Sequence, residues 1–196
     1  NQDFFRIESR FEENDIKAIY SKNNRAKQLE LNNNKQKATE FIGNIPLVLF
    51  APELIEIIIG SPKKRRQYID MVIGGIDRMH INNLNLYRHL LKQRNSALAK
   101  ANKYSDLSHW DSQLIKTGQN IVKKRSAFVL FSGGLINHYY HEATKKNQDA
   151  KVKIIYRDSL KAEDDWTESL SKNFAKDKLF GLTSVGPHRD DMLFLI

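Results

Sequence analysis

The sequence predicts a mixed α/β fold, in which a sheet-containing domain is interrupted by a helical insertion. Apolar and polar residues alternate over residues 4–31, which is typical of half-buried strands. Four apolar pairs then recur every seven residues between positions 114 and 136, which is typical of a long packed helix. Strand-like apolar runs return after position 150. With 196 residues, of which 40% are hydrophobic, the chain can form one domain or two small ones.

The first part of the chain predicts three short strands that are joined by polar turns into an antiparallel meander. Asparagines occupy the turns, because Asn tolerates the left-handed backbone that tight turns need. The stretch Asn32–Asn34 is expected to close the meander, and a short helix is expected at Lys37–Ile42. The three strands are expected at Phe4–Glu12, Ile16–Ser21 and Ala26–Leu31.

A continuous apolar run, Ile45–Phe50, has the length of a single strand. Such a run suits a strand that is buried on both faces, as in the α/β sheet of a P-loop-type protein. Pro52 ends this strand, and a short helix is expected at Glu53–Ile59.

A strongly basic helix start follows this segment. Ser61 is a good N-cap and Pro62 suits the first helical turn, so a helix is expected to begin at Pro62. Because the helix dipole favours anions at this end, four cations here indicate a nearby phosphate, carboxylate or nucleic-acid backbone. The alternative is a solvated basic turn that only adds solubility. The four cations are Lys63, Lys64, Arg65 and Arg66.

Two later helices are expected to pair. Leu84–Ala101 and Trp110–Lys146 each have one apolar face, and they are joined through Tyr104–His109. Together they would form an antiparallel helical arm. Breaks are expected at Gly74-Gly75 and at Gly133-Gly134, since two glycines cost roughly 2 kcal/mol of helix propensity. The apolar pairs of the second helix are Leu114-Ile115, Ile121-Val122, Phe128-Val129 and Leu135-Ile136.

The last part of the chain predicts a strand at Lys151–Tyr156, a helix at Trp166–Phe174 and a return to strand over Leu182–Ile196. A dense polar cluster lies inside this last segment and has three interpretations. It pairs charges internally, for example an arginine with an aspartate, or it lies near a nucleotide or a subunit interface, or it binds a metal. The cluster consists of His188, Arg189, Asp190 and Asp191.

The net charge of +9 is concentrated in one segment. Residues 61–103 hold ten basic and two acidic residues, so this segment carries +8 and the rest of the chain carries +1. A concentrated patch is what a polyanion such as DNA requires, although general basicity clustering by chance is the alternative. The candidate DNA-binding residues are Lys63, Lys64, Arg65, Arg66, Arg88, Lys92 and Arg94.

Several classes of protein are not supported by the sequence. There is no cysteine, which fits a reducing cytoplasm and excludes disulfides and thiolate metal sites. The apolar runs are too short to span a bilayer, so no membrane is expected. No Gly-x-x-x-x-Gly-Lys-Ser/Thr loop occurs, and no set of catalytic or metal-binding residues is complete.

Three separated motifs resemble the bacterial RecF recombination-repair family. The first is Pro52–Asp70, PELIEIIIGSPKKRRQYID. The second is Leu90–Asn95, LLKQRN, with Trp110-Asp111 after it, and the third is Gly186–Asp191, GPHRDD. Their order and spacing match the family, and the match covers nearly the whole chain.

The resemblance implies a piece of an SMC-type ABC ATPase head that carries a helical arm. Residues 1–60 would be part of the head, with an antiparallel side sheet and one core strand. Residues 61–180 would be the arm, and residues 181–196 would return to the head. The phosphate loop would lie before this chain, and the signature sequence and the Mg²⁺-binding acidic strand would lie after it. Strand-like residues at both ends of the chain agree with this expectation.

The resemblance also implies a function. A whole relative would bind ATP and Mg²⁺, form an ATP-dependent homodimer, bind DNA and work with RecO and RecR to load recombinase at gaps or stalled forks. This chain alone is expected to bind neither cofactor tightly, because it lacks the phosphate loop. The alternative is a free-standing basic helical module that binds nucleic acid or protein without a nucleotide.

Overall fold

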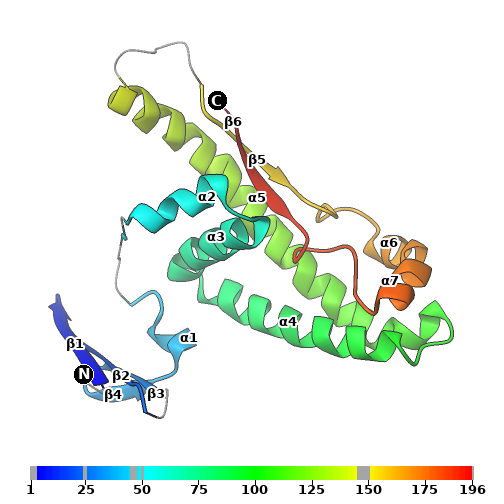
Figure 1. Ribbon diagram of the computed structural model, residues 1–196, viewed down its shortest axis with the longest axis horizontal. Coiled ribbons are helices and arrows are strands. Elements are labelled where there is room, and N and C mark those ends of the chain that lie inside the picture. The colour runs from blue at the N-terminus through cyan, green and yellow to red at the C-terminus, as the bar shows by residue number, and fades with distance from the viewer. Residues whose placement is uncertain (1–3, 24–25, 45–47, 50, 145–150, 196) are drawn as a thin grey trace. The chain divides into compact units, whose positions relative to one another are not determined.

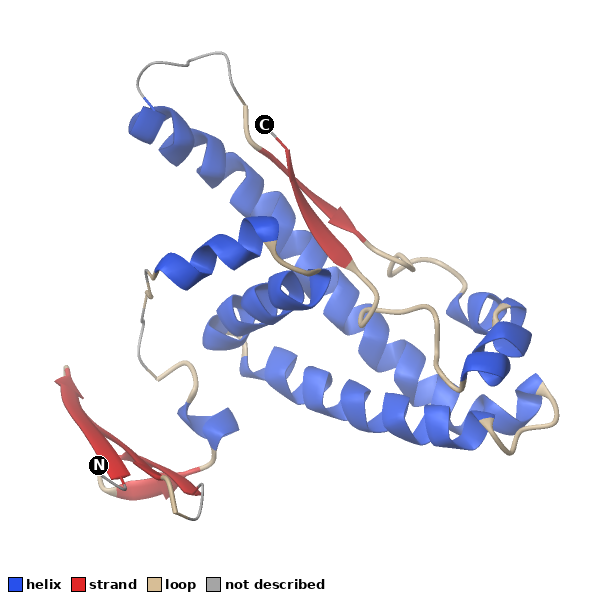
Figure 2. Cartoon of the chain, in the orientation of Figure 1, coloured by secondary structure: helices blue, strands red, loops and turns tan. Residues whose placement is uncertain are grey.

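The computed structural model describes residues 4–23, 26–44, 48–49, 51–144 and 151–195 (Figures 1 and 2). The chain divides into two compact units. The first comprises residues 1–49 with 74–78, and the second comprises residues 50–73 with 79–196. The segment after Pro52 belongs to the second unit, where Ile57 packs against a buried cluster. The expected division into head and arm after residue 60 stays a prediction.

The first unit contains a four-stranded antiparallel sheet with strands in sequence order. The predicted meander is confirmed, but a fourth strand follows it. Asn32 and Asn33 have φ of 52° and 62°, and Leu31 pairs with Asn34 across them. They therefore form a tight hairpin that extends the sheet instead of closing it. The elements are β1 (Phe4–Phe11), β2 (Asn14–Ser21), β3 (Ala26–Leu31), β4 (Asn34–Gln36) and the short helix α1 (Ala38–Phe41).

The predicted buried strand Ile45–Phe50 lies mostly outside the described residues. The two described residues, Val48 and Leu49, belong to no strand and are 95% and 62% exposed. For these two residues the prediction is wrong. A strand that is buried on both faces needs paired neighbours, and no described segment pairs with them.

The second unit is mainly helical and carries one two-stranded sheet (Figure 1). The helix that begins at Pro62 is confirmed, and a short helix also occurs in the expected stretch before it. The unit contains the 3-10 helices η1 (Pro52–Ile55) and η2 (Tyr104–Leu107) and all or most of the helices α2 (Glu56–Ile59), α3 (Pro62–Ile76), α4 (Arg78–Leu98), α5 (Ser108–Thr144), α6 (Trp166–Lys172) and α7 (Phe174–Phe180). Its strands are β5 (Lys153–Arg157) and β6 (Asp191–Leu195).

The expected breaks at the two glycine pairs are not where the sequence placed them. Helix α3 continues past Gly74-Gly75 to Ile76, and Asp77 separates it from α4. Helix α5 runs through Gly133-Gly134 without interruption. Just beyond this pair, the Asn137 side chain donates to the Val152 carbonyl at 2.7 Å and accepts from the Val152 N–H at 2.8 Å. These bonds fix the end of α5 and offset the low helix propensity of glycine.

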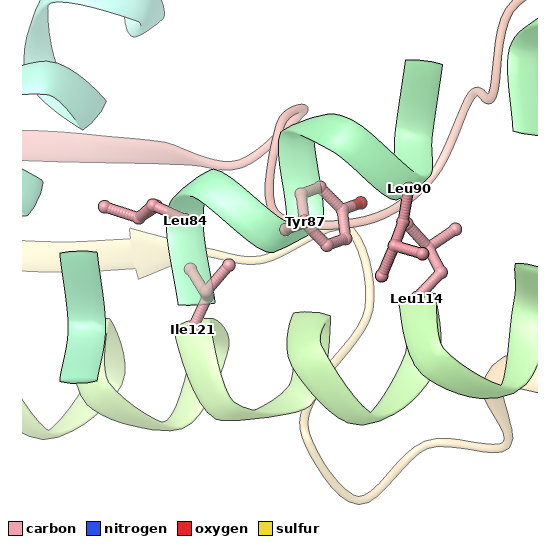
Figure 3. Close-up of a cluster of buried hydrophobic side chains, with 5 residues drawn as sticks. All are labelled: Leu84, Tyr87, Leu90, Leu114 and Ile121. Atoms are coloured by element: carbon pink, nitrogen blue, oxygen red, sulfur yellow. The ribbon is translucent and has the colours of Figure 1, made fainter. Parts of the chain in front are cut away.

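The predicted helical arm is confirmed by the packing of α4 on α5. Leu84, Tyr87 and Leu90 of α4 contact Leu114 and Ile121 of α5 in one buried cluster (Figure 3). These are the residues that the apolar periodicity of the two helices brings to one face.

Only the first half of α5 packs on α4, however, as the predicted helical arm requires. Val129 belongs to a cluster with Ile69 and Ile73 of α3 and Met192 of β6, and Leu135 is 44% exposed. The second member of an earlier pair, Val122, packs against Trp166. The repeated apolar pairs thus reflect burial on two sides of α5, because the two sides of the helix pack against different elements.

One glycine of α5 is required for the packing of Trp166 on this helix. A Cβ atom on Gly118 would lie 2.5 Å from Cζ3 of Trp166 and 3.1 Å from Cε2 of Tyr87. Trp166 is 2% exposed, so its ring has little room to move. The absence of a side chain at Gly118 therefore lets α6 approach α5 closely.

The C-terminal elements are partly as predicted. Strand β5 is confirmed and pairs antiparallel with β6, with Ile155 opposite Leu193. The predicted helix Trp166–Phe174 ends at Lys172, and a further helix, α7, begins at Phe174. The predicted strand Leu182–Ile196 is a strand only from Asp191, because residues 182–190 form a loop that bonds to helices instead of to a neighbouring strand.

Candidate functional site

The loop of residues 183–191 is held against the helices by a network of charged side chains. At its end, the Arg65 Nε and Nη2 atoms donate to the two carboxylate oxygens of Asp191 at 2.7 and 3.0 Å. Arg65 Nη1 also donates to the Gly60 carbonyl at 2.7 Å. Burial raises the pKa of Asp191, but the bonds from Arg65 outweigh it and hold that pKa below its usual value. The start of α3 and the start of β6 are therefore joined by one bidentate ion pair.

A second bidentate pair lies deeper in the network. Arg125 of α5 donates to both oxygens of Asp70 at 2.9 and 2.8 Å, and to the Pro187 carbonyl at 2.7 Å. His80 Nε2 lies 2.9 Å from Asp70 Oδ1. Burial opposes both charges, yet Asp70 raises the pKa of Arg125, and the bonds from His80 and Arg125 lower the pKa of Asp70. This pair connects three elements that are distant in sequence.

Asp190 is the third buried acid of the network. The Tyr156 hydroxyl and the Ser159 N–H donate to its carboxylate, the latter at 2.8 Å, and Arg125 lies 3.7 Å away. Burial raises the pKa of Asp190 despite these partners. Arg66 donates to its backbone carbonyl at 2.5 Å. Asp190 thus fixes β5 and the loop to each other.

The structure decides among the three interpretations of the 188–191 cluster only in part. Internal pairing is confirmed for both aspartates, but their partners are Arg65 and Arg125 instead of Arg189. Arg189 is exposed and donates to the Thr183 carbonyl at 3.3 Å. Among the described residues, no group of three or more His, Cys, Asp or Glu side chains could hold a metal ion. The metal interpretation is therefore not supported, and a role near a nucleotide or subunit interface stays a prediction.

His188 is held between two fixed partners. Its Nδ1 lies 3.0 Å from the Tyr87 hydroxyl and its Nε2 lies 2.9 Å from the Thr183 carbonyl. A carbonyl only accepts, so Nε2 carries the proton and Nδ1 accepts from Tyr87. Burial lowers the pKa of His188 to about 4, helped by the nearby charges of Arg189 and Arg66. His188 is therefore neutral at pH 7, which this pair of bonds requires.

A glycine makes this contact with Tyr87 possible. Gly186 has φ of 117°, and a Cβ atom on it would lie 2.5 Å from the Tyr87 hydroxyl oxygen. Ser159 Oγ accepts from the Gly186 N–H at 2.7 Å and donates to the Gly186 carbonyl at 3.0 Å. The Gly-Pro-His sequence thus places a loop directly on α4.

Acidification is expected to destabilise the fold through His188. The pKa of this residue is about 6.5 when unfolded and about 4 when folded, so its contribution is complete above pH 6.5 and is lost as the pH falls to 4. A shift of this size corresponds to about 3 kcal/mol between these limits. Urea unfolding between pH 7.5 and 4 should show this loss.

The matched comparison uses two histidines of the same chain. His188→Gln should remove this part of the pH dependence, whereas His89→Gln, at an exposed position of α4, should keep it. Acid sensitivity that is the same in all three proteins would show that another group, such as Asp70, is responsible.

A basic cleft opens beside this network. It has a volume of about 380 Å³, and its cationic residues come from α3, α4 and α5. Lys63, Arg66, Arg88 and Arg125 line it, against a single carboxylate, Asp70, that is already paired with Arg125. The pKa of Arg66 is lowered by burial and by the nearby charge of Arg125. The cleft therefore has an excess of positive charge, which favours an anion.

The seven predicted DNA-binding residues do not share one surface. Lys63, Arg66 and Arg88 line the basic cleft, and Lys92 lies in the next groove along α4. Lys64 is exposed and lies 3.0 Å from Glu56. Arg65 is paired with Asp191, as described above.

Arg94 must be removed from the candidate DNA surface. Its guanidinium is fully buried and donates to Asp111 at 2.7 Å, to Asp177 at 3.2 Å and to Thr183 at 2.8 Å. A phosphate cannot reach a group in this position. The sequence already held a signal for burial, because Leu90, Arg94 and Leu98 recur every four residues along one helix face.

Arg125 and Tyr87 were missed as site residues. Arg125 lies three residues after Val122 and four before Val129, and therefore on the buried side of α5. A cation at such a position indicates a buried partner. Tyr87 lies on the apolar face of its helix, and a hydroxyl that bonds a distant histidine leaves no periodic signal in the sequence.

The described residues do not assemble a site for ATP or Mg²⁺. The chain has no phosphate-loop sequence, and the aspartates of the network are bonded to arginines, a histidine or a tyrosine. We therefore assign no step of ATP chemistry to these residues. None of the helices in the described ranges is both long and apolar enough to cross a membrane.

No protein-family model matches this chain. Curated proteins that are named DNA replication and repair protein RecF do match it. The relative from Moorella thermoacetica is 33% identical over 87% of the chain. Those from Leptospira interrogans and Streptococcus gordonii are 36% and 35% identical over 80% and 85% of it. The chain is a homologue of the RecF proteins.

The match covers 46%, 43% and 48% of these three RecF proteins, so the chain spans about half their length. Two solved RecF structures cover all of the chain. The recombination mediator protein RecF-ATP of the RecFOR pathway has a TM-score of 0.85 at 30% identity, and RecF-ATPrS has 0.82 at 29%. The chain covers 56% of each. The mixed α/β class and the resemblance to RecF are thus confirmed.

Proposed function

We propose that this chain is part of a RecF-like DNA repair and recombination protein, and that its basic cleft binds backbone phosphates. The observation that carries the proposal is the convergence of Lys63, Arg66 and Arg88 on one cleft. Two of these cations follow Pro62 and the third lies more than 20 residues later, on another helix. The names of the RecF relatives, which refer to DNA replication and repair, support nucleic acid as the source of the phosphate.

The charges around the cleft favour a phosphate over an internal carboxylate. Asp70 and Asp191 are each taken by a bidentate arginine, and Asp190 accepts from Tyr156 and Ser159. The first turn of α3 carries Lys63 and Arg66, and the helix dipole at this end adds a field that favours an anion. An external anion is therefore the partner that these cations fit.

We further infer that the whole protein binds ATP with Mg²⁺ and dimerises. It would bind single-stranded or gapped DNA and work with RecO and RecR to load recombinase. The names of the two RecF structures support ATP in the relatives and a place in the RecFOR pathway. This chain would supply the arm and part of the head, and other parts of a RecF-like protein would supply the phosphate loop. A cytoplasmic location follows from this role and stays a proposal.

The test is a salt titration of DNA binding, followed by fluorescence anisotropy. If about four cations touch phosphates, log K against log salt should fall with a slope near −3 to −4 on duplex DNA. The double variant Arg88→Glu, Lys92→Glu should weaken binding uniformly across sequences and reduce the slope by about two.

The control is Lys116→Glu, Lys123→Glu, which makes the same change of charge at two exposed positions of α5. It should leave the slope nearly unchanged, because neither lysine lines the cleft. If both double variants weaken binding and reduce the slope equally, the affinity for DNA depends only on the net charge of the chain. If the Arg88→Glu, Lys92→Glu variant keeps the affinity and the slope of the parent chain, the cleft is not the DNA surface. The alternative function, a free-standing helical module that binds a protein partner, then gains support.

A further inference from the structure

The last turn of α7 and the residues directly after it expose three large apolar side chains. Leu179, Phe180 and Leu182 are 79%, 65% and 51% exposed, and Gly181 between them has φ of 65°. The Leu182 N–H donates to the Asp177 carbonyl at 3.1 Å and the Gly181 N–H donates to the Lys178 carbonyl at 3.4 Å. This is the Schellman motif, a standard helix end.

The motif lacks the hydrophobic contact that usually accompanies it. That contact joins the residue after the glycine to a residue in the last turn of the helix. The corresponding residues here are Leu182 and either Asp177 or Lys176, so the helix offers no apolar partner. The exposed leucine is therefore not explained by the stability of the helix end.

The turn is nevertheless held rigidly. The Thr183 N–H donates to Asn95 at 2.9 Å, and the Ser184 N–H donates to Asp177 at 3.0 Å. Asp177 is fully buried and bonded to Arg94. The three apolar side chains are thus presented on a fixed backbone, which reduces the entropy lost when a partner binds.

A groove with cationic walls lies beside the turn. It has a volume of about 400 Å³ and is lined by Gly181 and by the residues of α4 that face it. Two of these, Arg88 and Lys92, are cations, and no acid is among the lining residues. Lys176 and Lys178 are exposed on α7. Apolar contact area is therefore combined with positive charge. The α4 residues are Arg88, Leu91, Lys92, Asn95 and Ser96.

We propose that this surface docks a short segment of a partner protein in which apolar residues alternate with aspartate or glutamate. The exposed leucines and Phe180 would contact the apolar residues of the segment, and Lys92 and the neighbouring cations would pair with its acidic residues. Single-stranded nucleic acid fits less well, because two of the three apolar residues are leucines and cannot stack on bases. The docking surface goes beyond the proposed DNA cleft: of the residues that line the cleft it shares only Arg88, and Lys92 is the one further cation that the DNA titration also changes.

The experiment selects partners from a phage-displayed library of random peptides about twelve residues long. Peptides that bind the intact chain should be enriched in apolar residues flanked by acids. A synthetic copy should then bind the double variant Phe180→Ser, Leu182→Ser about tenfold or more weakly, as expected for the loss of central anchors. DNA affinity should be unchanged in this variant, which separates this proposal from the previous one.

The matched control is Leu130→Ser, Phe131→Ser, an equally exposed apolar pair on α5. It should leave peptide binding unchanged, and circular dichroism should show that both variants remain folded. Selection of no acidic-apolar peptide, or equal loss of binding in both variants, would overturn the proposal. Loss of oligonucleotide binding in the Phe180, Leu182 variant would assign the surface to nucleic acid instead.

Discussion

Replacing Arg125 by methionine should lower the free energy of unfolding by about 3–5 kcal/mol, as the loss of one partner of a buried ion pair usually does. Arg125 is 3% exposed, and it provides two of the hydrogen bonds of Asp70 and one of Pro187. Methionine fills a similar volume but donates nothing. The carboxylate of Asp70 would then stay buried with His80 as its remaining partner. Urea unfolding followed by circular dichroism measures the change.

The control is Lys123→Met, two residues earlier on the exposed side of the same helix. It removes the same charge and should change stability by less than about 0.5 kcal/mol. The double variant Asp70→Leu, Arg125→Met should recover part of the loss, because it also removes the buried carboxylate that Arg125 pairs with most closely. A single variant that is as stable as Lys123→Met would show that the network does not hold the loop.

Replacing Arg94 by methionine should cost about 3–5 kcal/mol for a related reason. Its guanidinium is fully buried and joins Asp111 of α5, Asp177 of α7 and the Thr183 hydroxyl. Without Arg94, the carboxylates of Asp111 and Asp177 would stay buried and would lose its positive charge and its hydrogen bonds. The loss should therefore exceed that of any exposed cation on α4.

The same variant also tests the correction that removed Arg94 from the DNA surface. At low temperature and without denaturant, where the variant stays folded, its salt slope on duplex DNA should equal that of the parent chain. Gln93→Met, at the neighbouring exposed position, is the control for stability. A slope that becomes shallower by about one in Arg94→Met would return this residue to the phosphate-binding set.

Periodicity predicted the elements in which apolar residues recur on one face, although β1 is exposed on both faces instead of half-buried. The strands of the meander and the packing of Leu84 on Ile121 were accessible in this way, because each residue is positioned by its own element. The apolar pairs of α5 predicted a packed helix but not its two different partners. Which neighbour a face meets depends on the connections between elements, and periodicity carries no information about these.

The site was less predictable because its partners are far apart in sequence. The motifs around Arg65 and Asp191 were recognised, yet their pairing was not, since 126 positions separate them. Charge alone also misassigned Arg94, because a cation in a basic segment looks the same whether it faces water or a buried aspartate. A core-facing position within the helix pattern was the better guide, for Arg94 and for Arg125 alike.

The long separation between Arg65 and Asp191 has a consequence for the order in which the chain folds. The α4–α5 hairpin uses neighbours in sequence and can form quickly, but the loop of residues 183–191 must be synthesised before Arg65 and Arg125 gain all their partners. A nascent chain that ends before this loop keeps these arginines without their last partners. Closure of the network is thus a late step of folding, and it sets how long the incomplete unit is exposed to chaperones and proteases.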